Sequence, residues 1–172
     1  IEPVMRASRE KPFLGICMGL QVLMQHSDEN GGIDCMGLYE GDVAYFGDHI
    51  DKSHHELKIP HMGWNRVQTK VDHPVFEGID ETDEFYFVHS FYPQPEQSDW
   101  VIATTEYGVP FPSIIGVDNL VATQFHPEKS GTNGLLILKN FLKAGERSFK
   151  PVQPSGTSVA FGSTMSTVNV FQ

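Results

Sequence analysis

A cysteine between two glycines is the first place where the residues suggest chemistry. Cys17 lies two residues after Gly15 and two residues before Gly19, directly after an apolar segment. Small residues on both sides are typical of a sharp strand-to-helix turn that holds a nucleophile outward, because they leave room for a strained backbone. A helix that begins just after the cysteine also favours the thiolate, the reactive form. The pattern predicts a nucleophile elbow, and a buried cysteine in a glycine-containing turn would give the same pattern.

His126 is the base that such a cysteine would need. It follows residues 120–125, which are predicted to form a strand, and α/β proteins place functional loops after their strands. Glu128 lies two residues further on, and residues i and i+2 of an extended segment project to the same side. The carboxylate would then orient the imidazole and favour the imidazolium. A surface loop would also explain this pair, but with Cys17 it predicts a nucleophile, a base and an orienting group.

Strands and helices alternate around these residues, which predicts an α/β fold. Helical spacing of apolar residues predicts a helix over 1–10 and another after Cys17, with a stripe formed by Leu20, Leu23 and Met24. A further helix is expected from Asn133 to about Leu142, with an apolar face that includes Leu135, Leu138, Phe141 and Leu142. Apolar, β-branched and aromatic segments predict strands over 13–16, 43–46, 64–67, 85–89, 101–105, 114–117 and 120–125.

Composition excludes several classes of protein. The chain has 172 residues, enough for one domain with a sizeable core, and no apolar run approaches the ~18 residues of a membrane span. We find no signal-peptide pattern and expect a cytoplasmic location. The net charge of −10 argues against a nucleic-acid partner. The two cysteines are expected to be reduced, and no zinc-ligand spacing joins the histidines in the polar segment, His49, His54, His55 and His61.

The composition changes near residue 147. Residues 147–172 are rich in Ser, Thr, Gly and Val, contain Pro151 and Pro154, and show no helical period. We therefore expect one folded domain over 1–146 and a disordered tail over 147–172, whose Val and Phe residues also allow a short added strand. Because the chain opens on Ile1 inside a predicted helix, we also expect the domain to be truncated at its N-terminus.

Four blocks of the sequence together resemble the class I (triad) glutamine amidotransferases. They are residues 11–21 (KPFLGICMGLQ), 61–65 (HMGWN), 86–91 (YFVHSF) and 122–131 (ATQFHPEKSG). The first and last blocks are typical of the whole family. The middle two, with the Lys-Ser-Gly ending, resemble its glutaminase subunits of imidazole glycerol phosphate synthase. Related enzymes for guanylate, anthranilate and carbamoyl phosphate usually carry His at the position of Leu20 and lack the Met-Gly-Trp-Asn block.

The resemblance implies a fold and a reaction. The fold is flavodoxin-like, a mostly parallel central sheet flanked by helices, and its N-terminal strands and Pro-Gly-Val-Gly loop have no counterpart in this sequence. The reaction is hydrolysis of L-glutamine to glutamate and ammonia, without cofactor or metal. Cys17 would form a thioester, His126 would move the protons and Glu128 would orient His126. The backbone N–H of Met18 would stabilise the oxyanion, and the missing loop would supply the second N–H.

The resemblance also assigns substrate and partner residues. Gln21, His89, Ser90 and Phe91 resemble the residues that hold glutamine. Met62, Trp64, Asn65 and Lys129 resemble the face that docks the cyclase partner, which has a (β/α)8-barrel fold and receives the ammonia. Simpler interpretations stay open for four of them: an exposed helix residue for Gln21, a packed strand-end residue for His89, a core residue for Trp64 and a solvated charge for Lys129. Two other functions also stay open, a γ-glutamyl hydrolase without a synthase partner and an inactive partner-binding module.

Overall fold

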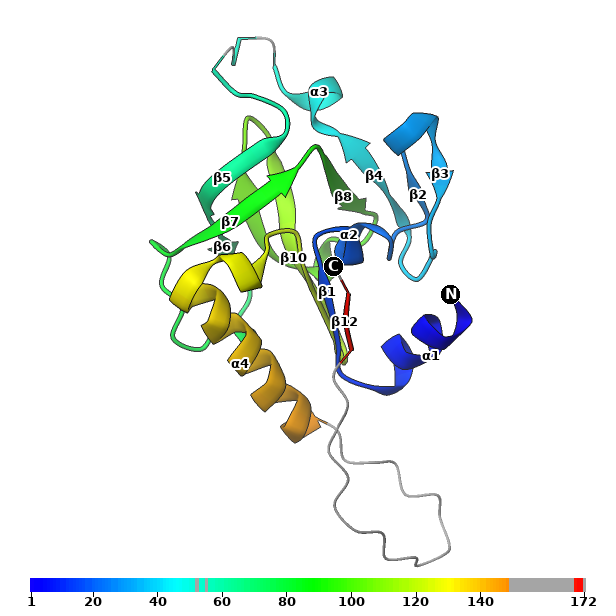
Figure 1. Ribbon diagram of the computed structural model, residues 1–172, viewed down its shortest axis with the longest axis vertical. Helices are drawn as coiled ribbons and strands as arrows, with labels where there is room; N and C mark the ends of the chain where they lie inside the picture. The colour runs from blue at the N-terminus through cyan, green and yellow to red at the C-terminus, as the bar shows by residue number, and fades with distance from the viewer. Residues whose placement is uncertain (52, 55, 149–168, 172) are drawn as a thin grey trace, which may run out of the picture.

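A computed structural model describes residues 1–51, 53–54, 56–148 and 169–171 of the chain (Figure 1). Most of the expected tail, residues 149–168 and 172, lies outside the described residues. The α-helices are α1 (Glu2–Glu10), α2 (Met18–Gln21), α3 (Phe46–His49) and α4 (Gly131–Ser148). The 3-10 helices are η1 (Glu29–Gly31), η2 (Pro74–Phe76), η3 (Ser98–Trp100) and η4 (Pro127–Lys129).

The main sheet is mixed and has six strands. Their order is β12 (Asn169–Phe171), β1 (Phe13–Ile16), β11 (Leu120–Thr123), β10 (Pro110–Val117), β9 (Val101–Glu106) and β6 (Gln68–Thr69). Strand β1 pairs in parallel with β11 on one side and with β12 on the other. The remaining three pairs are antiparallel. The predicted α/β class is confirmed, and the expected parallel arrangement holds around β1.

Two smaller sheets complete the fold. One has the order β3 (Ile33–Asp34), β2 (His26–Ser27), β4 (Gly41–Tyr45) and β8 (Phe91–Pro95). The other is the antiparallel pair of β5 (His61–Arg66) and β7 (Glu84–His89). The predicted segments 43–46, 64–67 and 85–89 overlap β4, β5 and β7, but Phe46 already begins α3 and Val67 lies just after β5.

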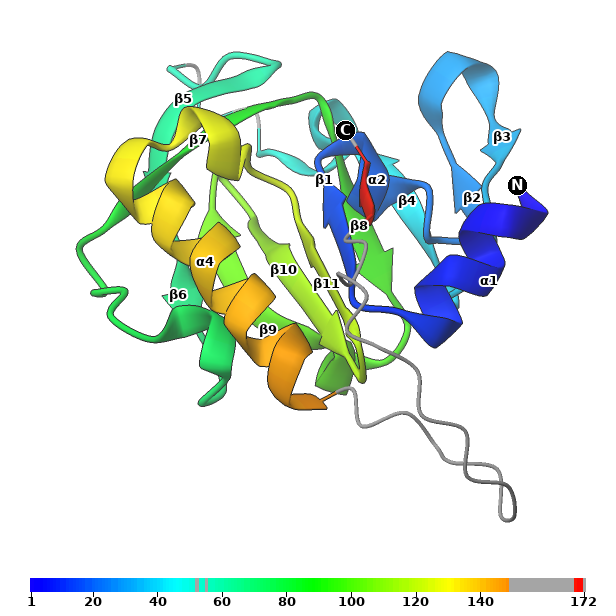
Figure 2. The same cartoon turned by 60° about the horizontal axis from the view of Figure 1, so that its bottom comes forward.

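The main sheet has apolar clusters on both faces because successive residues of β1 point to opposite sides. Leu14 and Ile16 belong to one buried cluster, which includes Ile137 and Phe141 of α4. Phe13 belongs to the other cluster, against which the half-buried Val4 of α1 packs. Figure 2 shows α4 and α1 on opposite sides of the sheet. All four residues of β1 are buried, as a central strand requires.

Two helix predictions need correction. The helix after Cys17 ends at Gln21, although the apolar residues expected on it are buried. In α4, Phe141 faces the core as predicted and Leu138 packs against it, but Leu135 and Leu142 are exposed and Ile137 is buried. Gly134 explains the second difference, because a Cβ there would overlap the carbonyl oxygen of Pro127. The bare glycine lets this face of the helix lie against η4, so Ile137 and Phe141 turn inward with it.

No helix in the described part of the chain is long and apolar enough to cross a membrane.

Candidate active site

The predicted elbow at Cys17 is present and strained. Cys17 follows the last residue of β1 and has φ 52° and ψ −103°, a conformation that non-glycine residues rarely adopt. Its backbone N–H donates to the carbonyl of Thr123 at 2.7 Å, and its own carbonyl accepts from Leu20 N–H at 3.0 Å. Gly15 must lack a side chain, since a Cβ there would lie 2.7 Å from the carbonyl oxygen of Gly19. Backbone hydrogen bonds before and after Cys17 therefore fix the conformation of the turn.

The sulfur of Cys17 is largely enclosed. Sγ lies 3.7 Å from Nε2 of Gln124 and 3.9 Å from the carbonyl oxygen of Val88. Burial raises the pKa of the thiol above its ordinary value, and the Met18 backbone N–H and the Gln124 amide oppose this only in part. The Met18 N–H at the helix N-terminus therefore favours the thiolate as expected, but burial has the larger effect and the pKa of the thiol is raised on balance.

His126 and Glu128 form a close pair. Nδ1 of His126 lies 2.7 Å from Oε1 of Glu128, so the imidazole donates from Nδ1 to the carboxylate and Nε2 is left to accept a proton. The predicted extended geometry ends at His126, because Glu128 lies in η4. Ser130 fixes the loop, since its hydroxyl donates to the His126 carbonyl at 2.6 Å and accepts from the Tyr86 N–H at 2.9 Å.

The nucleophile and the base come from neighbouring parallel strands. Ile16 of β1 pairs with Thr123 of β11, and Cys17 and His126 lie just beyond these two residues. Among the described residues, however, the sulfur of Cys17 makes no hydrogen bond with His126, and its polar side-chain contact is Gln124. Catalytic hydrogen bonds are often absent or long before substrate binds. The arrangement brings the three predicted residues to one edge of the sheet.

Gln124 is a site residue that sequence reasoning missed. Its side chain is fully buried, and its carbonyl oxygen accepts from Nε2 of Gln21 at 3.1 Å. Gln21 is buried too and donates to the Phe91 carbonyl at 2.8 Å, so its interpretation as an exposed helix residue is wrong. The available signal was a polar glutamine inside the apolar segment 120–125, because a buried amide needs partners.

The predicted glutamine-holding segment lies beside Gln21. His89 ends β7 and is buried, as expected for a packed strand-end histidine. Ser90 is half-buried, and its carbonyl accepts from the Phe46 N–H at 3.1 Å. Phe91 begins β8 and is half-buried. These three residues and Gln21 are therefore neighbours.

The predicted partner residues divide into two groups. Met62 and Trp64 are 61% and 54% exposed on the outer side of β5, so a core position for Trp64 is wrong. Lys129 is also exposed, as a solvated charge would be. Asn65 instead turns inward, with its amide nitrogen 3.2 Å from Nε2 of His61 and 2.9 Å from the carbonyl oxygen of Glu106. The side chain of Asn65 is therefore used within the protein, unlike the exposed side chains of the other predicted partner residues.

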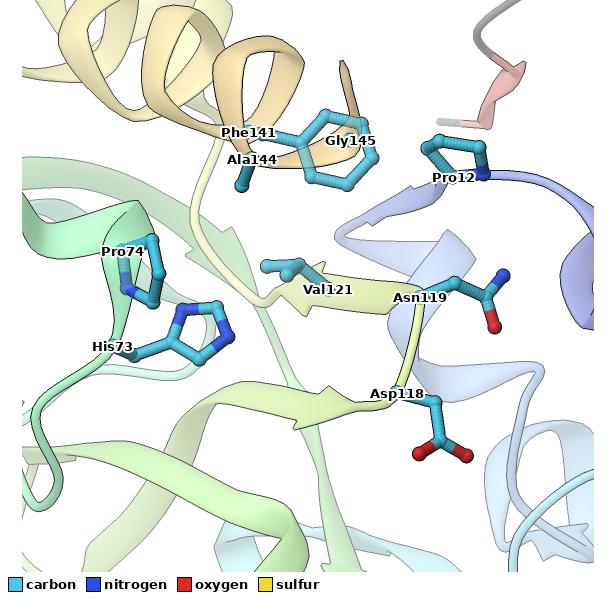
Figure 3. Close-up of a pocket in the computed structure, with 9 residues that line it drawn as sticks. All are labelled: Pro12, His73, Pro74, Asp118, Asn119, Val121, Phe141, Ala144 and Gly145. Carbon is cyan, nitrogen blue, oxygen red and sulfur yellow. The ribbon is translucent and has the colours of Figure 1, made fainter. Parts of the chain in front are cut away.

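Several hollows lie near the main sheet in the described part of the chain, and two of them lie toward opposite ends of β1. One of about 410 Å³ borders α2 and is lined in part by Met18 and Gln21. The other, of about 70 Å³, lies at the opposite end of β1, where Pro12 and the turn at Asp118 and Asn119 meet His73 (Figure 3). Of these two, the first is close to the elbow and large enough to admit a small molecule.

Comparison with known proteins gives the family. The family "Glutamine amidotransferase class-I" matches residues 1–144. The chain is 51% identical over 143 residues to "Imidazole glycerol phosphate synthase subunit HisH" of Acinetobacter baylyi, covering 83% of this chain and 67% of that protein. It is 45% identical over 139 residues to the protein of the same name from Pseudomonas putida, covering 81% and 66%. The chain thus spans about two thirds of the length of these curated relatives.

Solved structures agree on the fold. A putative GMP synthase component from Thermoplasma acidophilum matches with a TM-score of 0.56 and 19% identity, covering 80% of this chain and 59% of that chain. A second structure, described as a glutamine amidotransferase, matches with a TM-score of 0.53 and 17% identity, covering 84% and 67%. At these identities the likeness concerns the fold alone. The family match, the relatives and the elbow beside His126 lead to one conclusion: the chain belongs to the class I glutamine amidotransferases.

Proposed function

We propose that this chain is the glutaminase part of an imidazole glycerol phosphate synthase, which hydrolyses L-glutamine to glutamate and ammonia. The observation that carries the proposal is the strained Cys17 at the same sheet edge as the His126–Glu128 pair. The names of the relatives support the synthase, since they are called its subunit HisH.

The geometry supports a two-stage reaction. His126 takes the thiol proton at Nε2, and the sulfur of Cys17 attacks the side-chain amide carbon of glutamine. The Met18 backbone N–H stabilises the oxyanion, and His126 returns its proton to the departing ammonia. A water then gives a proton to His126 and attacks the thioester. The C–S bond breaks, glutamate is released, and His126 returns the proton to the sulfur to restore the thiol. Glu128 stabilises the imidazolium at each transfer, because its carboxylate accepts from Nδ1 at 2.7 Å.

Covalent labelling of Cys17 is the sharpest test of this proposal, because it needs the nucleophile and a bound glutamine analogue but no turnover.

A glutamine-like electrophile, such as a diazoketone analogue, provides that test. We expect it to alkylate Cys17 once per chain, with excess glutamine slowing the reaction, and mass spectrometry of tryptic peptides would locate the adduct. Cys35→Ser is the matched control because Cys35 is the other half-buried free thiol, and this variant should still be labelled. Cys17→Ser should not be labelled. Labelling at Cys35 alone, or labelling that glutamine does not slow, would contradict the proposal.

We further propose that a cyclase of (β/α)8-barrel fold docks on the outer side of β5, over Met62 and Trp64, with Lys129 nearby. Two large exposed apolar side chains on one strand support this, since such patches are typical of interfaces. In a titration with the cyclase, Met62→Ala and Trp64→Ala should weaken binding and leave analogue labelling unchanged. A γ-glutamyl hydrolase without a synthase partner would show labelling but no cyclase binding, and an inactive module would show binding but no labelling. A cytoplasmic location stays a prediction.

A further inference from the structure

Two buried histidines outside the proposed triad are in direct contact. Nδ1 of His61, at the start of β5, lies 3.1 Å from Nε2 of His89, at the end of β7. Both are almost fully buried, and no carboxylate in the described part of the chain bonds to either ring. Burial alone lowers the pKa of His61 to about 4. Burial, with smaller contributions from His61 and His126, lowers the pKa of His89 to about 3, although the hydrogen bond to the Phe91 carbonyl raises it. Both imidazoles are therefore neutral near pH 7.

The partners of each ring fix which nitrogen carries the proton. The Phe91 carbonyl can only accept, so Nδ1 of His89, 2.7 Å away, must be the donor. In the neutral ring Nε2 of His89 is then an acceptor, and Nδ1 of His61 must donate to it. Nε2 of His61 in turn accepts from the amide nitrogen of Asn65. All three hydrogen bonds run in one direction, from Asn65 toward Phe91.

The same Phe91 carbonyl links the two histidines to the residues that contact the nucleophile. It also accepts from Nε2 of Gln21 at 2.8 Å, so both of its lone pairs are used. Nε2 of Gln21 donates to Oε1 of Gln124 as well, which leaves Nε2 of Gln124 directed at Sγ of Cys17. The Gln124 amide is the polar side chain that touches the sulfur, and its orientation is set by Gln21.

We propose that His61 and His89 are positioning residues for Cys17, acting through the Phe91 carbonyl, Gln21 and Gln124. We call the series from Asn65 to Gln124 the amide–imidazole relay. It requires both rings to stay neutral. A second proton on His89 would place two donors face to face at the His61 contact, and the relay would break there. The consequence for catalysis rests on the proposed glutaminase function, whereas the effect on the thiol does not.

The rings packed on the two histidines of the relay are aromatic side chains that leave this proton pattern in place. His61 stacks between the rings of Phe87 and Tyr107, at centroid distances of 4.8 and 4.0 Å. His89 packs on the rings of Phe46 and Phe111. The charge of His126 reaches His89 and disfavours a second proton on it.

Replacing His61 tests the relay. His61→Phe keeps the stacked ring and removes both nitrogens, so His89 loses its donor. His61→Asn retains a donor at the position of Nδ1 and is the conservative rescue. Tyr107→Phe is the matched control, because it removes one hydrogen bond from the same stack, the 2.6 Å bond to the Lys58 carbonyl, without touching the relay. All variants are made in the full chain.

The readout is the rate at which iodoacetamide alkylates Cys17 in a Cys35→Ser background at pH 8. We expect about a tenfold loss in His61→Phe, the effect of one pKa unit on the thiolate fraction. His61→Asn should stay within about threefold of the parent, and Tyr107→Phe should match it. A rate in His61→Phe equal to or above that of the parent, or equal losses in His61→Phe and Tyr107→Phe, would overturn the proposal.

A second measurement does not depend on whether the variants fold. In the ¹⁵N-labelled unmodified chain, two-bond ¹H–¹⁵N spectra at pH 7 should show His61 and His89 neutral and protonated at Nδ1. Protonation at Nε2 in either ring would refute the relay. The analogue test separates the two proposals. If the diazoketone fails to label Cys17 but the variants keep the expected order of iodoacetamide rates, the glutaminase proposal fails and the relay stands. If the diazoketone labels Cys17 but the variants do not keep that order, the relay alone fails.

Discussion

Two histidines in the described part of the chain each donate a 2.7 Å hydrogen bond from Nδ1, and their environments are opposite. His126 donates to the carboxylate of Glu128 in a partly exposed loop. His89 donates to the Phe91 carbonyl in the core, with another imidazole on its other side. The carboxylate stabilises an imidazolium, whereas at His89 burial lowers the pKa by more than the hydrogen bond to the Phe91 carbonyl raises it.

The comparison shows that the length of the hydrogen bond does not decide the role of an imidazole. The charge of the acceptor and the access of water decide it. His126 is suited to take and return a proton, and His89 is suited to hold one proton at a fixed atom. His73 offers a third environment, in which the ring accepts a hydrogen bond from a backbone N–H. Substitutions at the three kinds of site test the comparison.

The largest difference should come from the same substitution at two positions. We expect His126→Asn to lower glutamine hydrolysis about 10³-fold, because the base is lost. His61→Asn should retain most of the activity, since a donor toward His89 persists. Steady-state ammonia release by both variants, compared with the parent chain, would check this. Equal losses at the two positions would show that both histidines do the same work.

A pH effect on stability should be the next in size. The unfolded chain binds protons at His61 and His89 below about pH 6.5, but the folded chain does not until about pH 4 and 3. Stability therefore rises with pH across this window and is lost as the pH falls. Between pH 6.5 and 5 we expect each ring to cost about 2 kcal/mol of unfolding free energy.

Urea unfolding at several pH values measures this effect. His61→Phe should show a shallower decline between pH 6.5 and 5 than the parent chain, because one titrating ring is gone. If the two chains decline in parallel, His61 is not buried in the neutral form.

The smallest effect on stability should come from replacing His73. Unlike His126 and His89, this histidine has a backbone N–H as its hydrogen-bond partner. Its Nδ1 accepts from the Val75 N–H at 3.2 Å and caps η2. We expect His73→Ala to cost about 1 kcal/mol of stability and His73→Asn to recover most of it, since Asn caps well. Cys17 alkylation should be unchanged in both, because His73 borders the small cavity at the other end of the sheet. An altered alkylation rate would mean that the two ends of the sheet are coupled.

Local patterns predicted much of this molecule. The first helix, the strand before Cys17 and the strained turn itself follow from apolar spacing and two glycines, and all three are confirmed. The predicted inward face of α4 was right for Leu138 and Phe141 but wrong for Leu135 and Leu142. It depends on how closely Gly134 approaches Pro127, a contact that helical periodicity does not contain. The relay was missed for the same reason. Gln124, His61 and His89 come from three separate segments, and the proton on each ring is defined only once those segments are assembled.

Ser130 has a consequence for how mutations should be tolerated. Its hydroxyl ties the backbone of His126 to the backbone of Tyr86, so a single oxygen atom joins the loop of the base to strand β7. Substitutions at Ser130 that remove the hydroxyl would break both hydrogen bonds. Alanine there would leave the backbone of His126 less firmly held, even with the side chains of His126 and Glu128 intact. Threonine keeps the hydroxyl and is the replacement that directed evolution should sample there first.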